Sequence, residues 1–232
     1  MILITRQRNF AAQTSTKLEQ LGYKALNLPM LHISYMYKEI VDNDYDLIVM
    51  TGQNSVYASS HIDWLKNKKV YAVGSETANL LQKSGYKNII FCQESSQNSD
   101  TLISLIKKNE QAGVKILYIS GADIAGNIEK QLLDAGYLIK REVVYKSILT
   151  ENLSEQAIGS INDLIKLVLF YSPRTALAFS NLAKKYKINL SAKSAVCISE
   201  KTAAKLNKDE WGKIIIAKIS SEASIIEAII TA

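Results

Sequence analysis

Residues 167–179, LVLFYSPRTALAF, combine a strand and the start of a helix in one short run. The first five residues are apolar or aromatic, which is typical of a strand buried on both faces. Ser172 suits a helix N-cap because its hydroxyl can bond a free helical amide, and Pro173 suits the first helical position because it has no amide hydrogen. The stretch therefore predicts a strand that leads directly into a helix.

The same layout occurs about half a chain earlier, in residues 47–58, LIVMTGQNSVYA. Two further pairs of segments resemble each other. Residues 2–6, ILITR, resemble residues 116–121, ILYISG, and residues 73–78, VGSETA, resemble residues 198–203, ISEKTA. Internal repetition of this kind indicates two similar halves.

Three glycines mark the ends of helical patterns. Gly22, Gly85 and Gly136 each precede a tyrosine and then a strand pattern. This is where a helix C-cap needs a residue with positive φ. A looser copy of the pattern ends at Gly212, where we expect the same conformation.

Short runs rich in Ile, Leu and Val alternate with amphipathic stretches along the whole chain. Near-continuous apolar runs of this kind indicate parallel strands covered by helices on both faces. The fold class is therefore α/β, with two similar Rossmann- or flavodoxin-like domains. The ten predicted strands are residues 2–5, 24–28, 47–50, 70–73, 88–92, 115–119, 138–144, 167–171, 195–198 and 213–217.

The repeats do not follow one another as a simple tandem. The first strand-helix-strand matches residues 115–145, whereas the segments near residues 47 and 167 match each other. Five strands per half are obtained only if residues 1–34 and 148–232 form one domain and residues 38–144 form an inserted domain. The chain would cross between them near residues 33–38 and 143–149 as a two-stranded linker, which suits a protein that opens and closes.

Composition narrows the class of protein. The 47% share of hydrophobic residues is enough for a packed core, and the net charge of +6 comes from scattered lysines rather than an arginine-rich block. We therefore expect no nucleic-acid partner. Cys92 and Cys197 each end an apolar run and are expected to be buried thiols. His32 and His61 have no second ligand at metal spacing, so no metal site is expected.

The beginning of the chain, MILITR, lacks the basic leader and apolar core of a signal peptide, and no apolar run approaches membrane-spanning length. We therefore expect a cytoplasmic protein without a membrane partner. We also expect a monomer.

The polar corners after the strands are the candidate ligand contacts. Helix N-termini at the carboxyl ends of parallel strands present free amides and a partial positive charge, which suits carboxylates or phosphates. Each Ser or Thr there could equally be a plain helix cap. The signatures G-x-G-x-x-G, GK[ST] and G-x-S-x-G are missing, so an enzyme of this sequence would need little beyond binding, orientation and one proton donor.

Taken together, the corners resemble the uroporphyrinogen-III synthase family, a group of cofactor-free enzymes of tetrapyrrole synthesis. Their order and spacing carry the resemblance more than any single piece. The matching pieces are LITR at residues 3–6, LPMLHI at 28–33, TGQNSV at 51–56, VGSETA at 73–78, SG at 120–121, GY at 136–137, VVYK at 143–146, SPR at 172–174, CI at 197–198 and TA at 202–203.

The resemblance implies a substrate, a reaction and a set of contacts. The substrate would be hydroxymethylbilane, a linear tetrapyrrole polycarboxylate, which is closed with loss of water and inversion of the last pyrrole ring. Tyr145 would donate a proton to the departing hydroxyl, although it could also simply pack the linker. No cofactor is implied. The implied substrate contacts are Arg6, Thr51, Gly52, Gln53, Asn54, Thr77, Gly121, Ser172, Pro173 and Thr202.

Several corners depart from the family pattern. Gly52 stands where a serine is usual, Ser120 where an arginine often precedes Gly121, and residues 199–201, SEK, where Gly-Pro-Thr is common. Contacts made through backbone amides survive such changes. The alternative function is a two-lobed module that binds a small anion without catalysis, and turnover of the substrate would separate the two.

Overall fold

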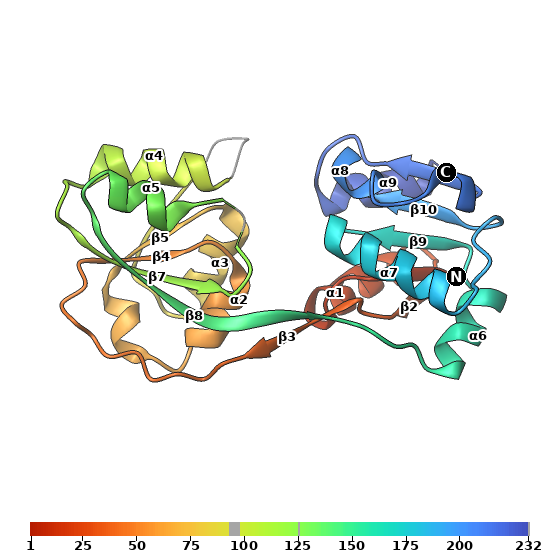
Figure 1. The fold of residues 1–232 in the computed structure, drawn as a ribbon, viewed down its shortest axis with the longest axis horizontal. Helices are drawn as coiled ribbons and strands as arrows, with labels where there is room; N and C mark the ends of the chain where they lie inside the picture. Colours follow the sequence, from red (N-terminus) through yellow and green to blue (C-terminus); the bar gives the residue numbers. More distant parts are fainter. Residues whose placement is uncertain (93–97, 125, 232) are drawn as a thin grey trace. The chain divides into compact units, whose positions relative to one another are not determined.

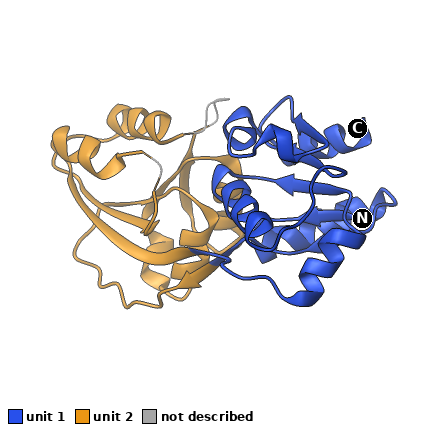
Figure 2. Ribbon diagram, turned by 45° about the vertical axis from the view of Figure 1, so that its right-hand side comes forward, with its two compact units in different colours: residues 1–32, 148–232 blue, residues 33–147 orange. Residues whose placement is uncertain are grey.

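The computed structural model describes residues 1–92, 98–124 and 126–231 of the chain. The described residues form two compact units, one made of residues 1–32 and 148–232 and the other of residues 33–147 (Figure 2). Each unit contains one sheet with helices on both faces (Figure 1).

The first unit has a five-stranded sheet in the order β11-β10-β9-β1-β2, and every neighbouring pair is parallel. Its elements are β1 (Ile2–Ile4), α1 (Arg8–Gln20), β2 (Ala25–Asn27), α6 (Glu155–Asp163), β9 (Leu167–Phe170), α7 (Pro173–Lys185), β10 (Ser194–Cys197), α8 (Glu200–Ala203), η2 (Lys208–Glu210), β11 (Lys213–Ile216) and α9 (Glu222–Ile230).

The sheet of the second unit has six strands in the order β3-β8-β7-β4-β5-β6, with parallel pairing from β8 to β6. Its elements are β3 (Leu31–Tyr35), β4 (Leu47–Met50), α2 (Gln53–Ser59), η1 (Asp63–Asn67), β5 (Lys69–Ala72), α3 (Ser75–Lys83), β6 (Asn88–Phe91), α4 (Ser99–Asn109), β7 (Lys115–Gly121), α5 (Ile128–Asp134) and β8 (Leu138–Leu149).

The strand orders confirm the expected relation between the halves. In one sheet β1 lies between β9 and β2, and in the other β7 lies between β4 and β8. The N-terminal strand-helix-strand therefore matches β7 to β8, and the β9 corner matches the β4 corner. All ten predicted strands are present. The first sheet has the order 2-1-3-4-5 of the flavodoxin-like fold. The second sheet follows the same order when β7 and β8 are counted before β4, and it carries β3 as an additional edge strand.

The two crossings form a strand pair, as expected. The Met36 amide donates to the Val144 carbonyl at 2.8 Å, and the Thr150 amide donates to the Met30 carbonyl at 3.1 Å. From Met30 to Met36 the chain advances by six residues, while the partner residue goes back by six, from Thr150 to Val144. This is the register of an antiparallel pair. β8 is longer than predicted because it continues from the sheet into this crossing.

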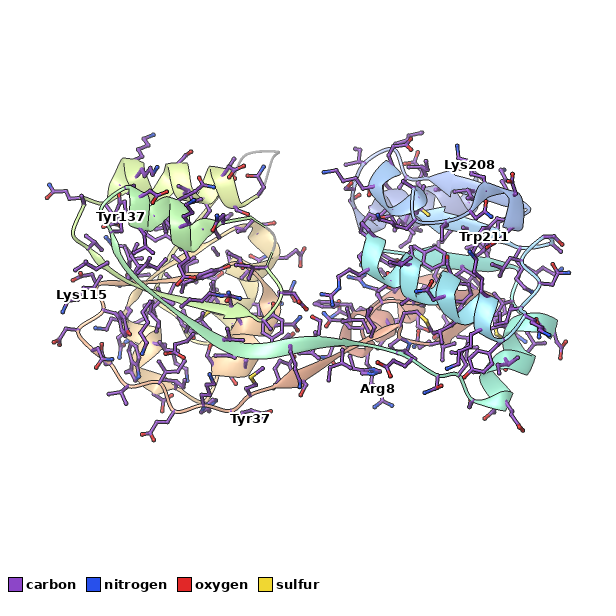
Figure 3. All side chains as sticks on the ribbon, viewed as in Figure 1. Arg8, Tyr37, Lys115, Tyr137, Lys208 and Trp211 are labelled. Carbon is purple, nitrogen blue, oxygen red and sulfur yellow. The ribbon has the colours of Figure 1, made fainter. Side chains whose placement is uncertain are left out.

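The strands are buried on both faces because alternate residues enter different cores. Ile48 and Met50 of β4 pack into one cluster, while Leu47 and Val49 pack into the cluster on the opposite face. In the first unit, Trp211, which is labelled in Figure 3, lies in the core. Its ring packs edge-on against that of Phe170, with ring centroids 5.8 Å apart. Both cysteines are buried free thiols, as expected.

The glycine pattern is correct at three positions and wrong at the fourth. Gly22, Gly85 and Gly136 have φ values of +82°, +89° and +84°. Gly212 is not a left-handed C-cap. It follows the short η2 helix, and a Cβ atom there would lie 2.5 Å from the Ser191 carbonyl oxygen. Close approach of backbone, rather than positive φ, explains this glycine.

Candidate active site

In the first unit, predicted contacts follow the carboxyl ends of β1, β9 and β10. Because these strands are parallel neighbours, their ends lie along one edge of the sheet. The order of the chain reverses between β1 and β9, which is where ligands bind in open α/β sheets. Thr5 joins the two strand ends, since its hydroxyl donates to the Leu169 carbonyl at 2.6 Å.

The hydroxyls of this edge are occupied by the local fold. Ser172 is the N-cap of α7, where its Oγ accepts from the Thr175 amide at 3.2 Å, and Pro173 is the first helical residue. Thr202 is fully buried, and its Oγ1 lies 3.1 Å from the Ser199 Oγ. Ser172 therefore acts as a helix cap, which is the alternative considered for it above. The Thr202 side chain is buried inside the unit.

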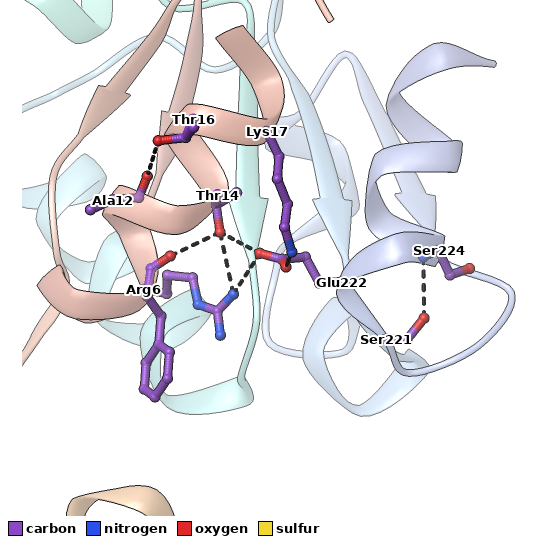
Figure 4. A network of polar contacts seen from close by, with 9 residues as sticks. Arg6, Ala12, Thr14, Thr16, Lys17, Ser221, Glu222 and Ser224 are labelled. Carbon is purple, nitrogen blue, oxygen red and sulfur yellow. Dashed lines mark hydrogen bonds and ion pairs between the residues drawn. The ribbon is translucent and has the colours of Figure 1, made fainter. Parts of the chain in front are cut away.

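Arg6 lies in a polar network between β1, α1 and α9 (Figure 4). Its Nη1 donates to Glu222 Oε1 at 3.0 Å and to Thr14 Oγ1 at 3.3 Å. Lys17 pairs with the other oxygen of Glu222. Burial opposes ionisation of Glu222, but the hydrogen bonds from Lys17 and Thr14 outweigh it and lower the pKa of the carboxyl. The charged contact predicted at Arg6 is thus paired with a carboxylate of its own unit.

Two aromatic rings lie against the Arg6 guanidinium. Its central carbon lies 4.9 Å from the Phe10 ring centroid and 4.2 Å from that of Tyr171, within the range of cation–π attraction. Burial raises the pKa of the Tyr171 phenol to about 12, although Thr14 and Arg6 lower it. The network therefore holds Arg6 in one position.

A hollow of about 710 Å³ follows the ends of β10 and β11. Lys201 and Lys218 line it together with Glu200 and two serines. This hollow belongs to the same strand-end edge as Thr202. Its lysines are cations that the sequence alone did not place together.

In the second unit, the corresponding edge is formed by the ends of β7, β4 and β5. Gly52 and Gly74 are the N-caps of α2 and α3, and as glycines they have no side chain that could cap either helix. Gln53 is the first residue of α2, and Asn54 Oδ1 accepts from the Tyr35 hydroxyl at 3.3 Å. Thr77 is buried in α3. These corners present backbone more than hydroxyl groups.

Thr51 touches a buried phenol of the neighbouring strand. Burial raises the pKa of Tyr118, and a hydrogen bond with Thr51 and the charge of Arg141 partly oppose that rise. The predicted contact Thr51 therefore takes part in a polar cluster at the ends of β4 and β7.

Tyr145 lies directly against Gly121. The two residues are register partners in β8 and β7, and a Cβ atom on Gly121 would lie 2.6 Å from Cε2 and Cζ of the Tyr145 ring. Burial, followed by the neighbouring phenols of Tyr118 and Tyr35 and the charge of Asp123, raises the pKa of Tyr145. Within the described part of the chain no group hydrogen-bonds to its hydroxyl. The phenol is thus a protonated donor without a local acceptor.

Arg141 is a polar residue of this edge that the sequence analysis missed. It lies in β8, and its Nε donates to Ser120 Oγ at 2.8 Å, while its Nη2 donates to the carbonyls of Gly121 and Ala122 at 2.5 and 2.9 Å. It lies within a strand, four residues before Tyr145, and it belongs to no sequence motif that would mark it as functional. Only the pairing of β8 with β7 brings it to the corner.

Among the residues with described positions, no group of three or more His, Cys, Asp or Glu side chains could hold a metal ion. No helix in the described ranges is long and apolar enough to cross a membrane.

Two flavodoxin-like units with polar strand-end corners define a two-domain parallel α/β protein suited to an anionic ligand. The family model described as Uroporphyrinogen-III synthase HemD matches residues 12–227. The chain belongs to the uroporphyrinogen-III synthase family, whose members are cyclising lyases of porphyrin and haem biosynthesis.

Solved structures of this family have the same fold. The uroporphyrinogen-III synthetase from Helicobacter pylori 26695 is 22% identical over 99% of this chain and 98% of its own, with a TM-score of 0.69. A mutant uroporphyrinogen III synthase from the extremely thermophilic bacterium Thermus thermophilus is 14% identical over 100% of this chain and 98% of its own, with a TM-score of 0.58. The family match supports the enzyme rather than the non-catalytic binding module.

Proposed function

We propose that this chain closes hydroxymethylbilane mainly by orienting it, with Tyr145 as the one proton donor. The reaction of the family removes the terminal hydroxyl as water and joins the resulting electrophilic carbon to the last pyrrole through a spiro intermediate, which inverts that ring. Closure without inversion is the competing outcome. Holding a flexible chain in one geometry can supply a large part of the required selectivity.

Backbone amides bind the substrate carboxylates in this proposal. The corners at Gly52, Gln53 and Asn54 and at Ser172 and Pro173 begin helices, where amides and the helix dipole attract anions. Thr51, Thr77, Gly121 and Thr202 lie at the same strand-end edges and shape these corners. Arg6 contributes a smaller share because its Nη1 is already paired with Glu222.

Tyr145 protonates the departing hydroxyl, so that the C–O bond breaks with both electrons on oxygen and water leaves. The electron-rich pyrrole stabilises the carbon cation that remains. The observation that carries this role is the position of the phenol, which is half-buried against Gly121, has a raised pKa and keeps its proton near neutral pH. General-acid help of this kind is typically worth ~10²–10⁴-fold.

The isomer composition of the product tests the proposed function. Purified chain and hydroxymethylbilane are mixed, the products are oxidised to porphyrins, and the isomers are separated. We expect the inverted isomer to predominate. A ratio equal to that of the uncatalysed closure, despite measurable binding of hydroxymethylbilane, would reject the enzyme and support the binding module.

We further propose a cytoplasmic monomer with neither a membrane nor a nucleic-acid partner. Two buried free thiols suit a reducing compartment. Light scattering of the purified chain should give the mass of one copy, and cell fractionation should recover it with the soluble proteins. A dimer mass at micromolar concentration would contradict the monomer.

A further inference from the structure

The end of β7 and the residue after it are held by one side chain of the neighbouring strand. Arg141 reaches along β8 and binds all three residues of the segment Ser120–Ala122: the Ser120 hydroxyl through Nε, and the Gly121 and Ala122 carbonyls through Nη2. A guanidinium can bond these oxygens at once because its donors have a fixed planar arrangement. The segment Ser120–Ala122 is thus held by one guanidinium group.

The same segment also contacts Tyr145. The Ala122 amide donates to the Tyr145 carbonyl at 2.8 Å. Gly121 leaves just enough room for the ring, since any Cβ would lie 2.6 Å from two ring carbons and 2.9 Å from the hydroxyl oxygen. The position of the segment Ser120–Ala122 therefore determines where the Tyr145 ring can lie.

A register irregularity makes this coupling direct. Ser120 pairs with Val143, but Gly121 pairs with Tyr145, so Val144 is an extra residue in β8. A bulge of this kind bends its strand and redirects the next side chain. Because the regular pairing of β7 with β8 is interrupted here, the hydrogen bonds from Arg141 help to fix the segment Ser120–Ala122.

We infer that Arg141 is a positioning residue for Tyr145, acting through the segment Ser120–Ala122 at the end of β7. The inference rests on the proposed role of Tyr145 in turnover, but the contact that it describes does not. It predicts that Arg141 affects the rate only while the phenol is present.

Kinetics in two backgrounds test this inference. We expect Arg141→Met to lower kcat about three- to tenfold with KM nearly unchanged, since small misplacement of a reacting group is costly. In a Tyr145→Phe background the same substitution should change kcat by less than roughly twofold, because coupled residues are not additive. Arg141→Lys, with a point charge in place of the fork, should fall between the parent chain and Arg141→Met.

Fluorotyrosine NMR gives a readout that is independent of turnover. The Tyr145 resonance is identified by its loss in Tyr145→Phe. It should shift in Arg141→Met and stay in place in the control Lys140→Met, which removes an exposed cation paired with Glu142 on the same strand. Gly121→Ala should also displace the resonance, because the new Cβ would clash with the ring while Arg141 is intact.

Two results would overturn the inference. One is an equal loss of kcat from Arg141→Met with and without the Tyr145 hydroxyl, which would make Arg141 a separate contributor. The other is an unshifted Tyr145 resonance in Arg141→Met. If Tyr145→Phe itself leaves kcat unaltered, the proposed acid role fails, and the resonance alone still decides whether Arg141 positions the ring.

Discussion

At the scale of single residues, space is the main constraint on two glycines. Gly121 makes room for a phenol and Gly212 makes room for a backbone carbonyl, and neither has a left-handed backbone. The two differ in what must give way. At Gly121 the atoms in the way belong to a side chain, whereas at Gly212 they are backbone atoms of Ser191 and Lys193.

Gly212→Ala should therefore destabilise the first unit. Because the new Cβ would lie 2.5 Å from the Ser191 oxygen and 3.3 Å from the Lys193 oxygen, the backbone must shift. We expect a loss of about 1–3 kcal/mol in the free energy of unfolding, measured by denaturant titration.

The matched control is Gly159→Ala in α6, where the added Cβ meets nothing within 4 Å. This substitution should raise the free energy of unfolding by about 0.5–1 kcal/mol, because alanine loses less conformational entropy than glycine when a helix forms. Equal effects of the two substitutions would show that close approach is not what selects Gly212.

Residue-scale contacts were the least predictable part of the site. The corners and their order followed from the sequence because caps and strand ends have local signals. The Arg6 partner, Glu222, lies 216 positions away along the chain, and Arg141 reaches Ser120 only through strand pairing. Such contacts depend on packing that no local pattern encodes.

At the scale of elements, α9 is tied to the start of the chain by a single carboxylate. Glu222 begins α9 and accepts from Arg6 and Thr14 near α1, in addition to its pair with Lys17. These bonds favour the charged carboxylate, so its folded pKa is lowered. The resulting stability is complete above the unfolded pKa of about 4.3 and is lost as the pH falls through the folded value.

Glu222→Gln should accordingly lower the free energy of unfolding near neutral pH by about 0.5–1 kcal/mol, allowing for partial exposure. The difference from the parent chain should shrink as the pH falls below about 4. The control Glu227→Gln removes a far more exposed pair with Lys218 on the same helix and should have little effect at either pH. A Glu222→Gln deficit that persists unchanged in acid would contradict the electrostatic explanation.

Gln53→Pro tests the amide-lined corner of α2. Proline is tolerated as the first helical residue, and Gly52 already has the extended ψ of 158° that a residue before proline needs. The fold should therefore survive by circular dichroism, while the loss of one amide raises KM. A folded Gln53→Pro enzyme with the KM of the parent chain would count against a carboxylate contact there.

At the scale of the whole molecule, the sequence of the second unit is inserted between the two segments that form the first unit. The second unit has its own sheet and two core clusters. The repeats in the sequence predict an interrupted order, because the matched corners do not follow one another as a tandem. We expect a fragment of roughly residues 37–145 to fold alone, as judged by circular dichroism and cooperative unfolding. An unfolded fragment, together with a folded one that keeps the N-terminus and ends near Arg141, would contradict the interrupted arrangement.

The central claim, orientation by the fold with a single proton donor, is tested most directly by Tyr145→Phe, with turnover and product isomer measured together. Part of the general-acid effect is replaceable by water, because the pyrrole itself activates the leaving hydroxyl. We therefore predict that turnover falls roughly ten- to a hundredfold while the product remains the inverted isomer. Unaltered turnover would return Tyr145 to a packing role, and release of mainly the uninverted isomer would mean that the phenol positions the last ring instead of donating its proton.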